Sequence, residues 1–195
     1  MRSPDPHRAR EPSDTPHVRQ RLVHAARDLM SELGPAGATA RAICDRAGVR
    51  APTLYHYFGD LAGLHATAIN AAFIEVMASY RRGNLAEGPL EAVRAAWRAL
   101  LRFARAEPLM ARALIGNVVD GKPPLALQLT LRRLRRDLSE LSQQGLLSMT
   151  PNAAAAMLWT SAVGAVSMTA ASDPNDEAVN EALLHALIAH LHRGR

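Results

Sequence analysis

Apolar side chains at the start of the chain follow a helical rather than a strand spacing. Between residues 17 and 33 they recur at intervals of three and four, which aligns them on one face of a helix. These positions are Leu22, Ala25, Ala26, Leu29 and Leu33. Gly34 and Pro35 follow directly, and both disfavour a continuing helix. The pattern therefore predicts a helix over residues 17–33.

Residues 39–77 predict two short helices and one long helix. Thr39 is a suitable N-cap, and Gly48 supplies the positive φ that a sharp reversal requires. Pro52 suits the first turn of a helix, and Asp60, after Gly59, suits the cap of the next one. The predicted helices cover residues 40–47, 52–58 and 61–77.

The second half of the chain predicts five more helices. Residues 125–131 alternate leucine with other residues, which by itself indicates a strand. The leucines then continue at helical spacing as far as Gly145, and Pro124 suits a helix start, so we predict a helix there too. The five helices are expected near residues 89–106, 109–118, 125–145, 151–171 and 175–192. The fold is thus expected to be all-α, with about nine helices.

Composition limits the class of protein. The chain has 195 residues, a net charge of +5 and one cysteine, Cys44. The charge is spread along the chain, so it favours an anionic partner only weakly. A single cysteine excludes an intrachain disulfide framework and a multi-cysteine zinc site. No apolar run approaches the roughly 20 residues of a membrane span, so we expect a soluble protein. The single cysteine and the lack of an apolar secretory signal at the start of the chain favour the cytoplasm.

The segment AGVRAPTLYHYF at residues 47–58 holds three of the eight aromatic residues of the chain. Two short helices joined by a glycine turn, with a longer helix before them, are typical of a helix-turn-helix unit, whose second helix lies in the DNA major groove. Leu54 and Phe58 lie four residues apart and are expected to share the inner face. The outward-facing residues are expected to be Pro52, Thr53, His56 and Tyr57, with Tyr55 on the flank.

This polar, aromatic face favours DNA as the partner. Hydroxyl groups bind phosphate oxygens, and a threonine methyl group contacts the methyl group of thymine. The alternative is that the tyrosines fill the core. We set it aside because Tyr55, Tyr57 and Phe58 cannot all face inward on so short a helix.

The stretch RLVHAARDLMSELGPAGATARAICDRAGVRAPTLYHYFGDLAGL resembles the N-terminal domain of TetR/AcrR-type bacterial transcriptional regulators. The resemblance covers residues 18 to about 70 and rests on the AGV turn, TLYHYF and the capped start of the next helix. It implies that Tyr55 holds a phosphate and that Arg41 reaches the adjacent backbone or a base edge. The full set of implied DNA-binding residues is Thr39, Arg41, Arg50, Ala51, Pro52, Thr53, Tyr55, His56, Tyr57 and Leu61.

Three positions depart from the family pattern. Arg50 stands where the family often has a serine cap, so it caps poorly but adds a candidate phosphate contact. Leu61 replaces a usual lysine, and we expect backbone N–H groups at that helix end to bind the phosphate instead. Cys44 replaces an alanine, and we expect it to be a small buried hydrophobic residue.

The larger second block is expected to dimerise and to bind an effector. A single helix-turn-helix unit reads one half-site, so a symmetric homodimer on a palindromic operator is expected, through the helices at 151–171 and 175–192. Methionine and tryptophan suit a pocket for an apolar or aromatic effector of unknown identity. The candidate residues are Trp97, Phe103, Met110, Met157, Trp159 and Met168, and ordinary core packing is the alternative for each of them.

The expected organisation is a disordered tail over residues 1–16, a DNA-binding domain over 17–66 and a helical effector-binding and dimerisation domain over 67–195. We predict a ligand-responsive repressor that a small, largely apolar effector releases from DNA. No motif indicates an enzyme, a cofactor or a metal site. The alternative is a helical small-molecule-binding protein without sequence-specific DNA binding.

Overall fold

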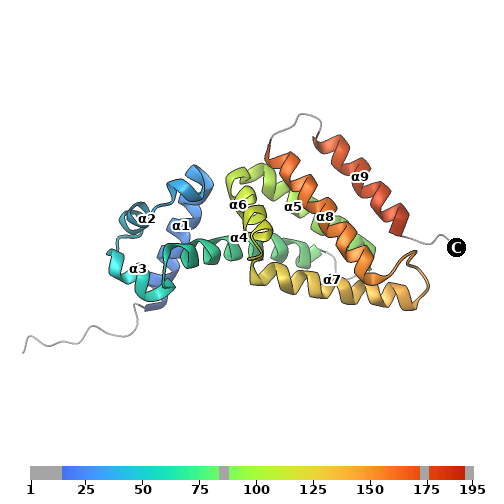
Figure 1. The fold of residues 1–195 in the computed structure, drawn as a ribbon, viewed down its shortest axis with the longest axis horizontal. Coiled ribbons are helices and arrows are strands. Elements are labelled where there is room, and N and C mark those ends of the chain that lie inside the picture. The colour runs from blue at the N-terminus through green and yellow to red at the C-terminus, as the bar shows by residue number, and fades with distance from the viewer. Residues whose placement is uncertain (1–14, 84–87, 172–175, 192–195) are drawn as a thin grey trace, which may run out of the picture.

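The computed structural model describes residues 15–83, 88–171 and 176–191, where every helix or strand element is an α-helix. Figure 1 shows a small N-terminal unit joined by one long helix to a larger helical domain. The helices are α1 (Thr15–Gly37), α2 (Ala40–Ala47), α3 (Ala51–Phe58), α4 (Leu61–Gly83), α5 (Pro89–Ala106), α6 (Pro108–Val119), α7 (Leu125–Gln143), α8 (Pro151–Ala170) and α9 (Asp176–Leu191). The expected all-α fold is therefore confirmed. Residues 1–14 of the expected tail lie outside the described residues, and α1 begins at Thr15, within the stretch expected to be tail.

Local signals in the N-terminal unit act as the sequence predicts. Gly34 has non-helical angles (φ 72°, ψ 175°), so the regular part of α1 ends there, before a last helical turn to Gly37. The Thr39 hydroxyl accepts a hydrogen bond from the Ala42 N–H at 3.2 Å, which caps α2. Gly48 ends α2 with a φ of 65°, a conformation that strongly favours glycine.

Helix α4 belongs to both parts of the molecule. Its first half buries Leu64 and Ala68 against the N-terminal unit, and its second half buries Phe73 and Met77 in the larger domain. At about 1.5 Å per residue, Leu64 and Phe73 lie roughly 14 Å apart along the axis. The helix continues without a break through residues 66 and 67, where the sequence placed the domain boundary.

The leucine-rich segment at residues 125–131 is helical, as expected. Helix α7 buries Leu127, Leu138 and Leu141 and lies along α4 and α8 (Figure 1). The Asn70 side chain of α4 accepts a hydrogen bond from the Ala126 N–H at 2.9 Å and so fastens the first turn of α7. The alternating leucines therefore lie on two sides of one helix. Leu127 is on the buried side, and Leu125 and Leu129 are exposed.

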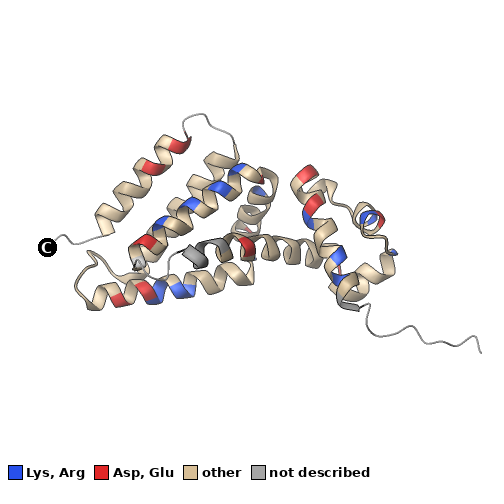
Figure 2. Cartoon of the chain, turned by 180° about the vertical axis from the view of Figure 1, so that it is seen from behind, with Lys and Arg blue, Asp and Glu red and all other residues tan. Residues whose placement is uncertain are grey.

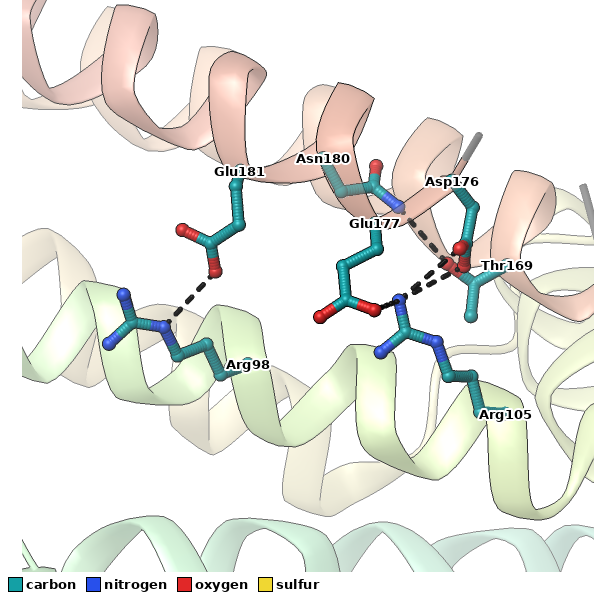
Figure 3. A network of polar contacts seen from close by, with 7 residues as sticks. All are labelled: Arg98, Arg105, Thr169, Asp176, Glu177, Asn180 and Glu181. Atoms are coloured by element: carbon teal, nitrogen blue, oxygen red, sulfur yellow. Dashed lines mark hydrogen bonds and ion pairs between the residues drawn. The ribbon is translucent and has the colours of Figure 1, made fainter. Parts of the chain in front are cut away.

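Polar contacts hold α9 against α5 and α8 (Figure 3). Arg98 donates to Glu181 at 3.2 Å, and Arg105 donates to Asp176 at 3.2 Å. Between them, the buried Asn180 amide donates to the Thr169 hydroxyl at 3.1 Å. These contacts fix how α9 lies on α8, and hence which face of each helix is left open.

Two segments, Leu61–Ala78 of α4 and Pro151–Ala170 of α8, are long and apolar enough by length and composition alone to span a membrane. Both are central helices of the fold, and 33% and 44% of their residues in these segments are buried inside it. Core packing therefore accounts for part of this composition.

Candidate DNA-binding face and effector cavity

Helices α2 and α3 form a helix-turn-helix unit that packs on α1 and α4. Leu54 of α3 is fully buried, together with Ile43 of α2. Phe58 is half-buried against the same core, with the Arg19 guanidinium 5.3 Å from its ring centre. The expected inward positions of Leu54 and Phe58 agree with this packing.

The exposed face of α3 differs in detail from the predicted one. Ala51, Pro52, Tyr55 and His56 are exposed, with Tyr55 at 48%. Thr53 is only half-buried, and Tyr57 is half-buried and packs against the core, so neither is fully outward as predicted. The reason is the helix rotation: burying Leu54 and Phe58 turns position 57 inward and position 55 outward.

Cationic side chains flank this face. Arg50 is exposed at the start of α3, where its side chain makes no capping hydrogen bond, as expected. The Arg41 side chain on α2 is 93% exposed, and its Nε atom lies 3.8 Å from the Asp45 carboxylate. Arg46 forms an ion pair with Glu32, in which nitrogen and oxygen are 2.7 Å apart. Figure 2 shows that acidic residues also lie on these N-terminal helices. In the described part of the chain, neither Arg50 nor Arg19, which lies over Phe58, has a carboxylate partner, and that of Arg41 is 3.8 Å away.

The N-terminus of α4 differs from the expected phosphate site. Leu61 is half-buried and packs against the core. The Asp60 carboxylate accepts a hydrogen bond from the Gly63 N–H at 2.7 Å, so negative charge already lies at this helix end. A Cβ atom at Gly63 would approach the Phe58 carbonyl oxygen to 2.5 Å, which explains the glycine there.

Cys44 lies in the core of the same unit, as the sequence predicted. It is 4% exposed, and burial, with a smaller contribution from the charge of Asp45, raises the pKa of its thiol. A buried, protonated thiol is a poor nucleophile.

We expect Cys44 in the native protein to react with a thiol reagent at least about ten-fold more slowly than in the unfolded chain. Each 1.4 kcal/mol of free energy needed to open the structure slows the reaction about ten-fold. The measurement is the rate of colour release from a disulfide reagent with and without guanidinium chloride. Equal rates would show that the thiol is accessible and would reopen a redox role.

A polar cluster joins the N-terminal unit to the larger domain. Arg27 of α1 donates to Glu75 of α4 and, at 3.1 Å, to Glu107, which lies between α5 and α6. Ser31 donates to the other oxygen of Glu107 at 2.7 Å. Burial would lower the pKa of Arg27, but the hydrogen bonds to both carboxylates outweigh it and raise the pKa. The cluster ties α1 to α4 and to the start of α6.

Helices α4, α5, α7 and α8 line a partly open apolar cavity of about 100 Å³. Most of its walls are aliphatic or aromatic, from Phe73 and Met77 of α4 to Leu158 of α8. A groove between α4 and α7 adjoins it and shares the lining residues Met77, Thr130 and Arg133. The groove leads to the exposed side chains of Ile74, Leu125 and Leu129.

The structure brings two of the six predicted effector residues together. Trp97 and Trp159 both line the cavity, and they are the only tryptophans in the chain. The other four are not part of its walls. Phe103 and Met110 are buried elsewhere in the core, and Met157 and Met168 are half-buried on α8. Phe103, Met157 and Met168 face other directions because only one side of α5 and one side of α8 turn toward α4 and α7. Met110 lies on α6, which contributes no residue to the cavity wall.

Several cavity residues were not predicted, among them Phe73, Thr130 and Asp137. One signal was available for Asp137. It lies three residues from Leu134 and six from Leu131, so it interrupts the apolar face of α7 with a carboxylate. An acid at an inward position of an amphipathic helix is costly without a partner or a role.

Comparisons with known proteins agree with this geometry. Residues 22–68 match the family "Bacterial regulatory proteins, tetR family". A TetR-family transcriptional regulator from Pectobacterium atrosepticum is 25% identical, with a TM-score of 0.70, over 95% of this chain and 100% of that one. A putative TetR-family regulator from a Rhodococcus species is 16% identical, with a TM-score of 0.76, over 90% of this chain and 99% of that one.

A third solved structure is that of RolR in complex with the ligand resorcinol. RolR is 23% identical to this chain, with a TM-score of 0.69, over 90% of both chains. No curated protein sequence matches the chain. The matched segment coincides with the helix-turn-helix unit, and the structural matches extend over nearly the whole length. The N-terminal unit therefore matches the TetR family of bacterial regulatory proteins, and the fold of nearly the whole chain is similar to that of solved TetR-family regulators.

Proposed function

We propose that this protein is a transcriptional repressor that binds a palindromic operator as a homodimer and leaves it when a small, largely apolar effector binds. The observation that carries the proposal is the position of α4. One continuous helix packs on the DNA-binding unit through Leu64 and lines the apolar cavity through Phe73 and Met77.

The exposed face of α3 is the part that enters the major groove. Tyr55 and His56 lie there with short neighbours at Ala51 and Pro52, which allow close approach of the helix to the bases. Arg41 and Arg50 contact phosphates on either side. Thr53 and Tyr57, at the edge of this face, keep their predicted contacts through the hydroxyl groups.

Replacing Tyr55 with alanine is expected to weaken operator binding by about 1–3 kcal/mol without changing the fold. Binding is measured by fluorescence anisotropy with an operator selected from random DNA fragments. The affinity of the wild-type protein is also expected to fall steeply with salt, because phosphate contacts release counterions. Gln143→Ala on the exposed side of α7, away from α3 and from the proposed dimer helices, is the control. Wild-type affinity for Tyr55→Ala would contradict the assigned face.

The open faces of α8 and α9 support the homodimer. Ala156, Thr160 and Gly164 are exposed on α8, and Val179 is 44% exposed on α9. Small side chains on α8 permit close approach of a second helix, and α9 adds apolar contact area. A two-fold axis through this face would place two α3 helices on one side of the dimer, as a palindromic operator requires.

The effector acts through α4 and the Arg27 cluster. A ligand in the cavity presses on Phe73 and Met77, and α4 carries the displacement to the N-terminal unit. The resorcinol-bound relative shows that a protein of this fold takes up a small molecule. For this chain the effector has to favour the conformation in which the two α3 helices no longer match the major-groove spacing.

Arg27→Ala is expected to leave ligand binding intact and to reduce the effect of the ligand on DNA affinity by about 1–2 kcal/mol, a typical coupling free energy. The two affinities are measured separately, each with and without the other partner. Arg21→Ala, an exposed change on the same helix, serves as control. An unchanged ligand effect in Arg27→Ala would show that the cluster does not transmit it.

Titrating ligands that bind the cavity against the operator complex tests the whole proposal. A fall in DNA affinity at saturating ligand supports it, and an unchanged affinity removes the release mechanism. A protein that binds ligand but no DNA fragment at low salt would instead be a carrier.

A further inference from the structure

Two residues of the cavity wall carry polar groups without a hydrogen bond. The indole N–H of Trp97 is buried and has no hydrogen-bond partner among the described residues, and Trp97 is 4% exposed. Asp137 lies on the wall formed by α7. In the described part of the chain, its ion-pair partners are the Nε atoms of Arg133 and Arg136, each 3.9 Å from a carboxylate oxygen. That distance is longer than a hydrogen bond. The residues of the cavity wall therefore include one unpaired donor and one carboxylate without a close hydrogen bond.

Other polar side chains on the walls do not supply these missing hydrogen bonds. Thr130 already donates its hydroxyl hydrogen to the Ala126 carbonyl at 2.8 Å. Arg133 is 45% exposed, so its guanidinium lies toward solvent at the rim. A buried polar group without a partner is rare in native proteins and calls for an explanation. A bound molecule that pairs with Trp97 and Asp137 supplies one.

The size of the cavity limits that molecule to about one ring. An engineered protein cavity of about 150 Å³ binds benzene, and the volume here, about 100 Å³, is of the same order. A fused ring system or a long acyl chain would have to extend from the cavity into the adjoining groove. The adjoining groove, which shares Met77, Thr130 and Arg133 with the cavity, gives a path to solvent.

The charges at the rim select a neutral molecule. An anion would meet the Asp137 carboxylate, and a cation would meet the Arg133 guanidinium, since both residues line the cavity. Burial raises the pKa of Asp137 and outweighs the opposing effect of the two arginines, which shows that the carboxylate lies in a poorly solvated place. Apolar walls also penalise the removal of a full charge from water.

We propose that the effector is a neutral molecule of about one ring in size that carries a hydroxyl group, which accepts a hydrogen bond from the Trp97 N–H and donates one to Asp137. This inference rests on the proposed effector role of the cavity and names the chemistry of its ligand. Trp97 and Asp137 are then the residues that determine specificity.

Four probes of similar size test the proposal on the full-length protein: toluene, benzyl alcohol, benzoate and benzylammonium. Binding is measured by calorimetry and by the fluorescence of Trp97 and Trp159, which both line the cavity. Benzyl alcohol is expected to bind about three- to ten-fold more tightly than toluene, the effect of one or two hydrogen bonds. The two ions are expected to bind more weakly than toluene.

Two variants separate the polar contacts from the apolar fit. Trp97→Phe keeps a ring and removes the N–H, and Asp137→Leu removes the carboxylate from a half-buried position. Each is expected to bring benzyl alcohol to the affinity of toluene and to leave toluene within about two-fold. Glu140→Leu, an exposed change one turn along α7, is the control and keeps the preference. Thermal melting of each variant confirms that it is folded.

The outcomes distinguish this inference from the proposed function. Equal affinity for toluene and benzyl alcohol, or tighter binding of either ion, overturns the polar selectivity while the cavity remains a ligand site. An equal loss of both neutral ligands in Trp97→Phe overturns the hydrogen bond as its cause. If no probe binds, the inference fails together with the effector half of the proposed function, and the DNA-binding half is judged by Tyr55→Ala.

Discussion

Phe73→Ala is expected to lower the free energy of unfolding by about 3–5 kcal/mol, the usual cost of truncating a buried phenylalanine to alanine. Phe73 is 1% exposed and lies in the second half of α4, where it forms part of the cavity wall. This loss has two parts: the transfer free energy of the apolar surface that is no longer buried, and the cost of the larger void left by the missing ring. The tryptophan fluorescence is expected to shift too, since Trp97 and Trp159 line the same cavity.

Denaturant unfolding at several protein concentrations measures this effect and separates it from any loss of dimer. The matched control is Ile74→Ala, the next residue on α4, which is 44% exposed and faces the groove. We expect that change to cost about 1 kcal/mol or less, because much of the side chain already contacts water. Equal losses for the two variants would show that α4 is rotated relative to the structure described here.

Leu54→Ala is expected to destabilise the DNA-binding unit by about 2–5 kcal/mol and to abolish operator binding. Leu54 is fully buried and anchors α3, a helix of eight residues. Helices shorter than about 12 residues are marginal in water without tertiary contacts. Without its anchor, α3 is expected to unfold locally while the larger domain retains its helices.

Tyr55→Ala, one residue away, is the matched variant for this prediction. Tyr55 is 48% exposed, so its removal is expected to change stability by no more than about 0.5 kcal/mol while weakening DNA binding. Hydrogen exchange of α3 amides, with circular dichroism, distinguishes a local loss of α3 from global unfolding. A Leu54→Ala protein with protected α3 amides and unchanged DNA affinity would contradict the buried position of Leu54.

The helices and the helix-turn-helix unit could be predicted from the sequence because their signals are local. Apolar spacing, the Thr39 cap and the positive φ of Gly48 each act within a few residues, and each agrees with the structure. The leucines at 125–131 show the limit of such signals. Their alternation fits a strand, and the continuing helical spacing and the contacts of α7 with α4 and α8 decide for a helix.

The orientation of the aromatic residues on α3 was predicted only in part. The sequence indicates that some must face outward, and Tyr55 and His56 do. It cannot tell Tyr57 from Tyr55, because a rotation of the helix by a fraction of a turn exchanges their exposure. The packing of Leu54 and Phe58 against α1 and α4 sets that rotation.

The sequence by itself predicted the all-α fold, the helix-turn-helix segment and its resemblance to TetR-type regulators, since these follow from short-range spacing and from a motif of neighbouring residues. Only the tertiary structure decided which residues form the cavity and which cluster joins the two parts. Trp97, Asp137 and Phe73 come from three different helices, and Arg27 and Glu107 are 80 residues apart. Such contacts depend on how amphipathic helices are rotated and crossed, and many similar sequences satisfy the same local pattern with different contacts.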